Sequence, residues 1–67
     1  MNIKVRFLNE SGNDLPGAMF FYARDPKGDK YAETQCAISR AKQKASAAGQ
    51  RVLEIISHSD EVKVWVA

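Results

Sequence analysis

The chain lacks the residues that usually cross-link a very small domain. It has one cysteine, Cys36, and one histidine, His58, among its 67 residues. A disulfide within the chain needs two cysteines, and a zinc site needs several cysteine or histidine ligands, so the sequence excludes both. A chain of this length buries only about 60% of the surface that it exposes when unfolded. We therefore expect one thin core, held by packing alone, in a single domain that spans residues 1–67.

Long apolar segments are also absent. The longest apolar run, residues 18–23, is far shorter than the roughly 20 residues that a membrane-spanning helix needs. Met1 is not followed by the basic and then apolar segment of a secretory signal. A single unpaired cysteine is more typical of a reducing compartment than of a secreted domain. These features predict a cytoplasmic protein that makes no contact with a membrane.

Acidic residues are missing from one long stretch of the sequence. The net charge of +2 does not by itself indicate a nucleic-acid-binding protein, but the charges are unevenly distributed. No aspartate or glutamate occurs between Thr34 and Leu53, whereas several basic residues do: Arg40, Lys42, Lys44 and Arg51. The sequence therefore predicts a region of positive potential.

Alternating polar and apolar residues predict strands at both ends of the chain. In residues 3–8, Ile3, Val5 and Phe7 alternate with basic residues, which is the period of a half-buried strand. The strands expected after this one are residues 18–24, 51–57 and 62–66. Turns rich in glycine and proline follow the first two strands, and a polar turn at residues 58–61 joins the last two as a hairpin.

One helix is expected in the middle of the chain. Thr34 is a suitable N-cap, residues 35–48 contain no glycine or proline, and Gly49 suits the position just past a helix end. Residues 30–33 are interpreted as a short strand or as the approach to this helix. The apolar residues of the helix recur at spacings of three and four and form one stripe: Ala37, Ile38, Ala41, Ala45 and Ala48.

The order of these elements predicts an α+β fold of the type β-β-α-β-β. We expect the helix to pack on one face of an antiparallel sheet of three to four strands, leaving the other face uncovered. The apolar residues of the first strand should face the helix, together with Val62, Val64 and Val66, and Leu53 and Ile55 should lie opposite these valines. The residues expected on the uncovered face are Tyr22 or Phe20, Trp65, Lys4, Arg6 and Lys63.

The side chains that catalysis requires are not grouped in the sequence. Cys36 and His58 lack a third group to orient them, and a lone cysteine beside a helix stripe is usually a small packed hydrophobe. His58 lies in a polar turn and is interpreted as solvated, and the glycines do not have the strand-to-helix placement of a phosphate loop. We expect a non-enzymatic protein that holds no cofactor or metal and acts by binding.

Two surfaces are candidates for that binding. On the helix, Arg40 and Lys44 lie on one side, Lys42 lies on a different flank, and Arg51 would extend the basic region. This region is either a solvated face or a contact for phosphates or an acidic protein surface. On the sheet, Tyr22, Lys63 and Trp65 would combine aromatic and basic groups, which fits a protein interface, packing within the chain or on a second copy, or a single-stranded nucleic-acid platform.

The second half of the chain resembles small inhibitors encoded by bacteriophages and other mobile elements. The residues that carry the resemblance are the helix Ser39-Arg40-Ala41-Lys42-Gln43-Lys44-Ala45-Ser46, the strand Val52-Leu53-Glu54-Ile55-Ile56 and the aromatic hairpin strand that follows. This pattern, over about half of the chain, is similar to that of type I-F anti-CRISPR proteins. The resemblance implies docking on a nucleic-acid-guided complex so that its access to DNA is blocked. The basic helix flank or the aromatic sheet face would then be the docking surface.

A second resemblance concerns the segment that leads into the helix. Tyr31-Ala32-Glu33-Thr34 is similar to a segment of a small coliphage inhibitor of bacterial RNA polymerase. The arginine pair that this inhibitor has on its last strand is absent, because Glu54 and Ser57 occupy that region, so no binding residue is transferred. Three hypotheses follow from the sequence: an inhibitor of a host protein or ribonucleoprotein complex, a direct nucleic-acid-binding domain, or a self-associating accessory domain. The chain is expected to be a monomer or a homodimer.

Overall fold

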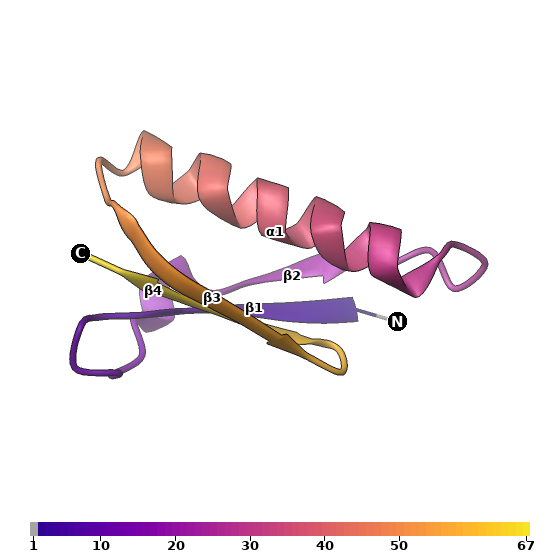
Figure 1. Ribbon diagram of the computed structural model, residues 1–67, viewed down its shortest axis with the longest axis horizontal. Helices are drawn as coiled ribbons and strands as arrows, with labels where there is room; N and C mark the ends of the chain where they lie inside the picture. The colour runs from indigo at the N-terminus through magenta and orange to yellow at the C-terminus, as the bar shows by residue number, and fades with distance from the viewer. Residues whose placement is uncertain (1) are drawn as a thin grey trace.

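The computed structural model describes residues 2–67 and shows one helix lying on one face of a four-stranded sheet (Figure 1). The elements are β1 (Asn2–Leu8), β2 (Phe20–Ala23), α1 (Lys30–Ala47), β3 (Val52–His58) and β4 (Glu61–Val66), with a short 3₁₀ turn at Pro16–Ala18. The α+β class and the β-β-α-β-β order predicted from the sequence are confirmed. Within residues 2–67 no α-helix covers the sheet face opposite α1, and we call this the open face.

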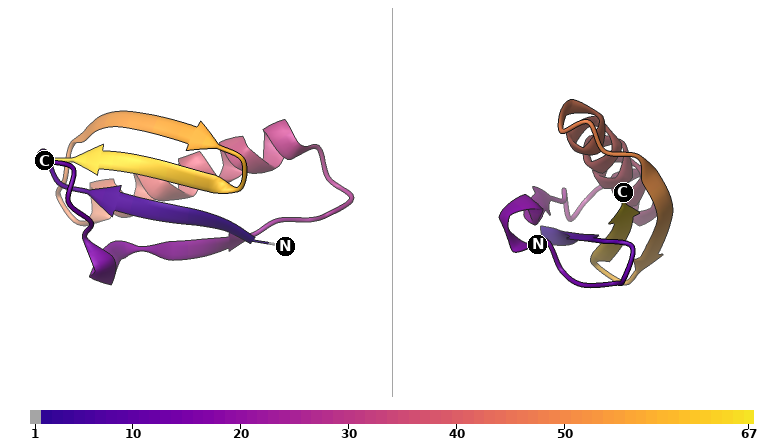
Figure 2. Two further views of the ribbon diagram at one scale, coloured as in Figure 1. Left: turned by 90° about the horizontal axis from the view of Figure 1, so that it is seen from below. Right: turned by 90° about the vertical axis from the view of Figure 1, so that its left-hand side faces the viewer.

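The sheet is mixed because its two central strands are parallel. The strand order is β2-β1-β4-β3, as the left view of Figure 2 shows. The two outer pairs, β1 with β2 and β3 with β4, are antiparallel, but β1 and β4 run in the same direction. This central pair differs from the expected antiparallel sheet. Parallel neighbours require a long crossover connection, which here contains α1.

The core lies between α1 and the inner faces of the two central strands. β1 contributes Ile3, Val5 and Phe7, and β4 contributes Val62, Val64 and Val66, all of them buried. As expected from the period-two alternation of both strands, these residues face the helix. These side chains are fully buried because α1 covers the two central strands and a strand flanks each of them on both sides.

Alanines form the helix side of this core. Ala37, Ala41 and Ala45 are fully buried, and Ile38 packs at the margin of the cluster. Their small side chains let α1 lie close to the sheet, since they leave only a methyl group between the helix backbone and the strands. Ala48, which the helical spacing placed on the same stripe, is exposed at the C-terminal end of the helix.

α1 begins one turn earlier than the sequence indicates. Asp29 is the N-cap, and its Oδ2 accepts a hydrogen bond of 3.1 Å from the backbone N–H of Ala32. The prediction that Thr34 caps the helix is wrong, because the Thr34 hydroxyl donates to the carbonyl of Lys30 within the helix. Residues 30–33 are consequently the first helical turn. At the other end, Gly49 has a φ of 71° and follows the helix as predicted.

The side chains of the aromatic strand β2 face the opposite sides of the sheet from those expected. Ile3 pairs with Tyr22 and Val5 pairs with Phe20, so both aromatic side chains lie on the helix side of the sheet. The prediction that Tyr22 or Phe20 points outward is therefore wrong. The outward aromatic residue is Phe21, which is 57% exposed and pairs with Lys4.

The hairpin of β3 and β4 is tighter than predicted, and its first strand is irregular. His58 pairs with Glu61, so only Ser59 and Asp60 form the turn, with Ser59 at a φ of 54°. Ile55 lies opposite Val64 as expected. Leu53 does not face the core, because the register shifts between Val52 and Glu54 and leaves Leu53 exposed.

Candidate binding surface

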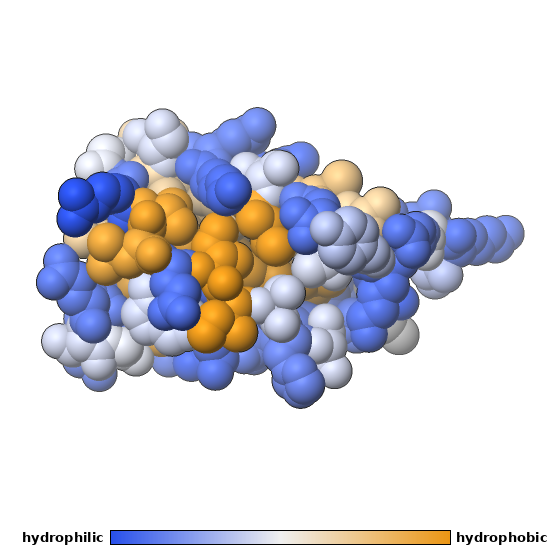
Figure 3. Space-filling model, viewed as in Figure 1, coloured by the Kyte–Doolittle hydropathy of each residue, from blue (hydrophilic) through white to orange (hydrophobic). Residues whose placement is uncertain are grey.

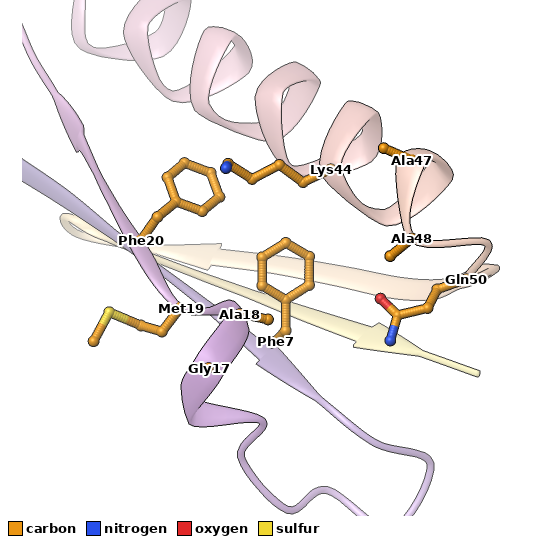
Figure 4. A pocket seen from close by; sticks show the side chains of 9 residues that line it. All are labelled: Phe7, Gly17, Ala18, Met19, Phe20, Lys44, Ala47, Ala48 and Gln50. Carbon is orange, nitrogen blue, oxygen red and sulfur yellow. The ribbon is translucent and has the colours of Figure 1, made fainter.

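A groove separates α1 from the edge strand β2. The helix packs chiefly on β1, β3 and β4, so the inner face of β2 lies beyond the cover that α1 provides. Two hollows occupy this space, one of about 450 Å³ next to Phe20 and one of about 380 Å³ next to Tyr22. We call the two together the α1–β2 groove. Figure 4 shows the first hollow, with β2 on one side and the C-terminal half of α1 on the other.

Aromatic rings form the floor of the groove. Phe20 and Tyr22 are half-buried, and the Phe20 ring lies 6.1 Å from the ring of Phe7 in the core. The ammonium of Lys44 stands over Phe20, with its Nζ 5.0 Å from the ring centroid, and Figure 4 shows this side chain reaching from α1 toward β2. This cation–π contact holds a positive charge at the mouth of an apolar hollow.

The helix wall of the groove is basic. Arg40 and Lys44 differ by four positions, so they lie within about 40° of each other around the helix, whereas Lys42 is about 200° from Arg40. Arg40 lines the hollow next to Tyr22, and Lys44 lines the hollow next to Phe20. Within residues 2–67 neither side chain forms an ion pair. Residues 2–67 therefore supply no carboxylate that neutralises the two charges on this wall.

One acidic group lies near the Tyr22 end of the groove. Burial raises the pKa of the Tyr22 hydroxyl above its ordinary value, and the neighbouring Cys36 and Glu33 side chains raise it further. The groove is thus positive toward Phe20 and carries a carboxylate toward the start of α1. Cys36 itself is exposed, so the interpretation of it as a packed hydrophobe is wrong.

The two remaining cations of the predicted basic region stand apart from the groove. Lys42 is exposed on the opposite side of the helix, as expected from its position. Arg51 is exposed after the helix end, where its backbone N–H and carbonyl bond to those of Ala67. Neither forms an ion pair within the described part of the chain, residues 2–67.

One of the three cations on the open face, Arg6, is neutralised by carboxylates. The Arg6 guanidinium forms ion pairs with Asp14 at 2.8 Å and with Glu61 at 3.3 Å. The hydrogen bond from Arg6 holds the pKa of Asp14 below its usual value. Lys4 and Lys63 also lie on this face. The open face therefore carries fewer free cations than its sequence indicates.

Trp65 lies on the open face as predicted, but it is half-buried. The loop after β1 approaches it, because a side chain at Gly12 would come within 4.0 Å of the Trp65 indole nitrogen. The β1 residue that pairs with the exposed Phe21 lies four positions before the β1 residue that pairs with Trp65. Phe21 itself is on β2, two strands away from the strand of Trp65. The two rings are therefore separated by about 13 Å along the strands and about 10 Å across them, so they do not form a continuous stacking platform.

A third surface is apolar and lies along the outer edge of the sheet at β3. Leu53 and Ile56 of β3 are 44% and 46% exposed, Ile56 on the open-face side opposite Lys63, whereas Ile38 and Ile55 are half-buried on the helix side of the same edge. Figure 3 shows this patch below α1, over β3. This surface was not predicted, although the run of apolar residues in β3 is a signal for it in the sequence.

No group of three or more potential metal ligands occurs within residues 2–67. Neither helical segment in that range has the length and apolar character of a membrane span.

The seven predicted site residues fall into three groups. Arg40, Lys44 and Tyr22 meet in the α1–β2 groove, Lys63 and Trp65 share the open face, and Lys42 and Arg51 belong to neither. Sequence reasoning missed that Tyr22 lies with the basic helix flank, because Phe20-Phe21-Tyr22 is aromatic throughout and its phase cannot be read from alternation. It also missed Phe20 as the partner of Lys44.

Comparisons with protein-family models, with curated proteins and with solved structures find no match to this chain.

Proposed function

We propose that this chain is a non-enzymatic binding protein that docks on a nucleic-acid-processing complex, as small phage and mobile-element inhibitors do. The observation that carries the proposal is the pair of uncompensated cations, Arg40 and Lys44, at the rim of the α1–β2 groove. The resemblance of the helix and the last two strands to type I-F anti-CRISPR proteins supports the same class of partner.

Unpaired cations at a rim favour docking on an acidic protein surface. They raise the association rate of a negatively charged partner, and the affinity then falls as salt screens the charges. A hollow with an aromatic floor beside them adds apolar area that a partner side chain can bury. Docking of this kind would obstruct the partner without any chemistry on the part of this chain.

Direct binding of single-stranded nucleic acid has weaker support. Such a platform needs aromatic rings spaced for successive bases and free cations around them. On the open face, Phe21 and Trp65 are far apart and Arg6 is already paired with two carboxylates. For this reason we place the docking surface at the groove.

The test is capture of a purified type I-F CRISPR surveillance complex by the tagged protein, together with an assay of DNA interference. We expect retention of the complex, loss of interference and weaker capture as salt rises from about 0.05 M to about 0.5 M. The double variant R40E/K44E should bind the complex at least about tenfold more weakly than wild type. Each substitution places a glutamate against the acidic surface of the partner, so that like charges repel.

The matched control is K27E/K30E, which makes the same change in charge. Lys27 and Lys30 lie in the β2–α1 loop and the first turn of α1, outside the hollow that contains Lys44. This control should bind as wild type. Absence of capture and intact interference would overturn the proposal, as would a gel shift of free DNA or RNA by the wild-type chain that R40E/K44E abolishes.

A further inference from the structure

We infer that β2 accepts an extended acidic segment of a partner polypeptide as an added strand, seated along the α1–β2 groove. The inference specifies the partner's chemistry at the surface proposed above and rests on that proposal. Strand addition joins a main-chain hydrogen-bond ladder, which gives affinity, with pockets for alternate side chains, which give specificity. The edge of β2 and the groove beside it supply both parts.

The backbone of β2 has unpaired groups at its free edge. The backbone N–H of Lys4 donates to the carbonyl of Asp60 at 2.8 Å, so Lys4 is turned toward β4. Its neighbours Ile3 and Val5 are therefore turned toward β2, where they pair with Tyr22 and Phe20. It follows that Phe21 and Ala23 turn their N–H and C=O groups away from β1.

No other part of the described chain is hydrogen-bonded to this edge. Within residues 2–67, no hydrogen bond from a turn, loop or side chain reaches the backbone of Phe21 or Ala23. β2 is also the last strand of the sheet on this side. An incoming extended segment can pair with these two residues without displacing an existing bond.

The position of an added strand places its side chains against the basic helix wall. A strand paired with β2 lies about 4.8 Å beyond it, and every second side chain then points to the helix side of the sheet. Those side chains enter the groove between β2 and the flank that carries Arg40 and Lys44. Carboxylates at these positions form charge-assisted bonds with both cations, which is why we infer an acidic segment.

The groove also distinguishes the two ends of such a segment. Lys44 lies over Phe20, whereas Glu33 lies near Tyr22 at the start of α1. Arg40 lies between them along the helix and lines the hollow next to Tyr22, so carboxylates are favoured along the stretch from Lys44 to Arg40 and disfavoured beside Glu33.

The other edge of the sheet is less suited to this mode of binding. β3 has a register shift between Val52 and Glu54, which interrupts the regular row of backbone groups. The surface beside it is the apolar patch that includes Leu53 and Ile56. β3 therefore offers no uninterrupted ladder, and the helix flank on its side carries one cation, Lys42, in place of the pair Arg40 and Lys44.

The experiment uses a fluorescein-labelled peptide of eight residues in which glutamate and threonine alternate, a sequence chosen for strand propensity and solubility. A peptide of alternating lysine and threonine is its control. Fluorescence anisotropy at low salt should show at least about tenfold tighter binding of the glutamate peptide. R40E/K44E should lose this preference, and K27E/K30E should keep it.

Two substitutions at one position test the ladder itself. Phe21→Pro removes the outward N–H without removing a bond to β1, and proline is tolerated at sheet edges. Phe21→Ala removes the same side chain but keeps the N–H. We expect Phe21→Pro to bind the glutamate peptide at least about tenfold more weakly than Phe21→Ala. Equal binding by these two variants, once circular dichroism shows both to be folded, would overturn the inference.

An independent measurement on the wild-type chain covers the case in which Phe21→Pro does not fold. Backbone NMR of the wild-type chain with the glutamate peptide should show shifts and slowed hydrogen exchange at the amides of Phe21 and Ala23. Changes confined to β3 or to the open face would contradict the inference. These peptide measurements do not involve the CRISPR complex. A failure to bind the complex and a failure to bind the peptide can therefore be distinguished.

Discussion

Arg6 decides the electrostatic character of the open face. It is one of the cations that the alternation of β1 places outward, yet two carboxylates from different parts of the chain converge on it. Asp14 arrives from the loop after β1, and Glu61 arrives from the start of β4. Residues far apart in sequence thereby pair one of the three cations of this face, while Lys4 and Lys63 form no ion pair within residues 2–67.

The Arg6–Asp14 pair predicts a pH dependence of stability. Its hydrogen bond lowers the pKa of Asp14 from the ordinary 3.8, so the stabilisation is complete above that value and is lost as the pH falls through the lower folded-state pKa. Asp14→Asn should be less stable than wild type near neutral pH, and the difference should vanish in strong acid. Thermal unfolding measured between about pH 2 and about pH 6 tests this.

Glu10→Gln is the control for this titration. Glu10 is exposed in the same loop, and within residues 2–67 it forms no ion pair. Its variant should follow the wild-type pH profile. A difference between wild type and Asp14→Asn that stays constant down to the lowest pH would show that Asp14 acts without its charge.

At the scale of the element, the start of α1 is set by the loop before it. The Asp25 side chain accepts from the N–H of Lys27, and the backbone of Gly28 donates to the carbonyl of Asp25, which closes a turn. Asp29 then follows this turn directly and caps the helix. This turn, rather than Thr34, therefore sets where the helix begins.

The cap makes a testable difference between these two residues. Asp29→Ala should lower the free energy of unfolding by about 1 kcal/mol, because it leaves a helix N–H without its partner. Thr34→Ala should change it by less than about 0.5 kcal/mol, as is usual for a position inside the helix away from a cap. Urea denaturation of both variants measures the comparison. A larger loss of unfolding free energy for Thr34→Ala than for Asp29→Ala would show that Thr34 is the cap.

At the scale of the whole molecule, the distance between helix and sheet is fixed by the alanine stripe. Ala37, Ala41 and Ala45 are fully buried against the valines of β4 and the apolar residues of β1. Because the helix covers the two central strands and β3 at close range, β2 is left outside, and the α1–β2 groove exists. The candidate site is thus a consequence of how the two layers are packed.

This packing predicts the effect of a larger side chain in the stripe. Ala41→Leu should destabilise the fold by about 1–3 kcal/mol, because the added atoms have no room between the layers. Ala47→Leu, at an exposed position of the same helix, should change stability by less than about 0.5 kcal/mol. Thermal and urea unfolding of the pair test this. Equal stabilities would mean that the layers separate easily.

The sequence alone determined the elements and most of the core. Strict alternation in β1 and β4 and the spacing of the alanines each encode a buried face locally, so those residues were predicted correctly. Gly49 ended the helix as predicted, since its side-chain-free backbone adopts a positive φ without strain.

Only the tertiary structure decided the phase of β2, the parallel pairing of β1 with β4 and the neutralisation of Arg6. Each of these depends on which distant segments become neighbours. Local alternation carries no such information, and the aromatic run of β2 does not even alternate. The α1–β2 groove therefore appears only when Tyr22, Arg40 and Lys44 are brought together by folding.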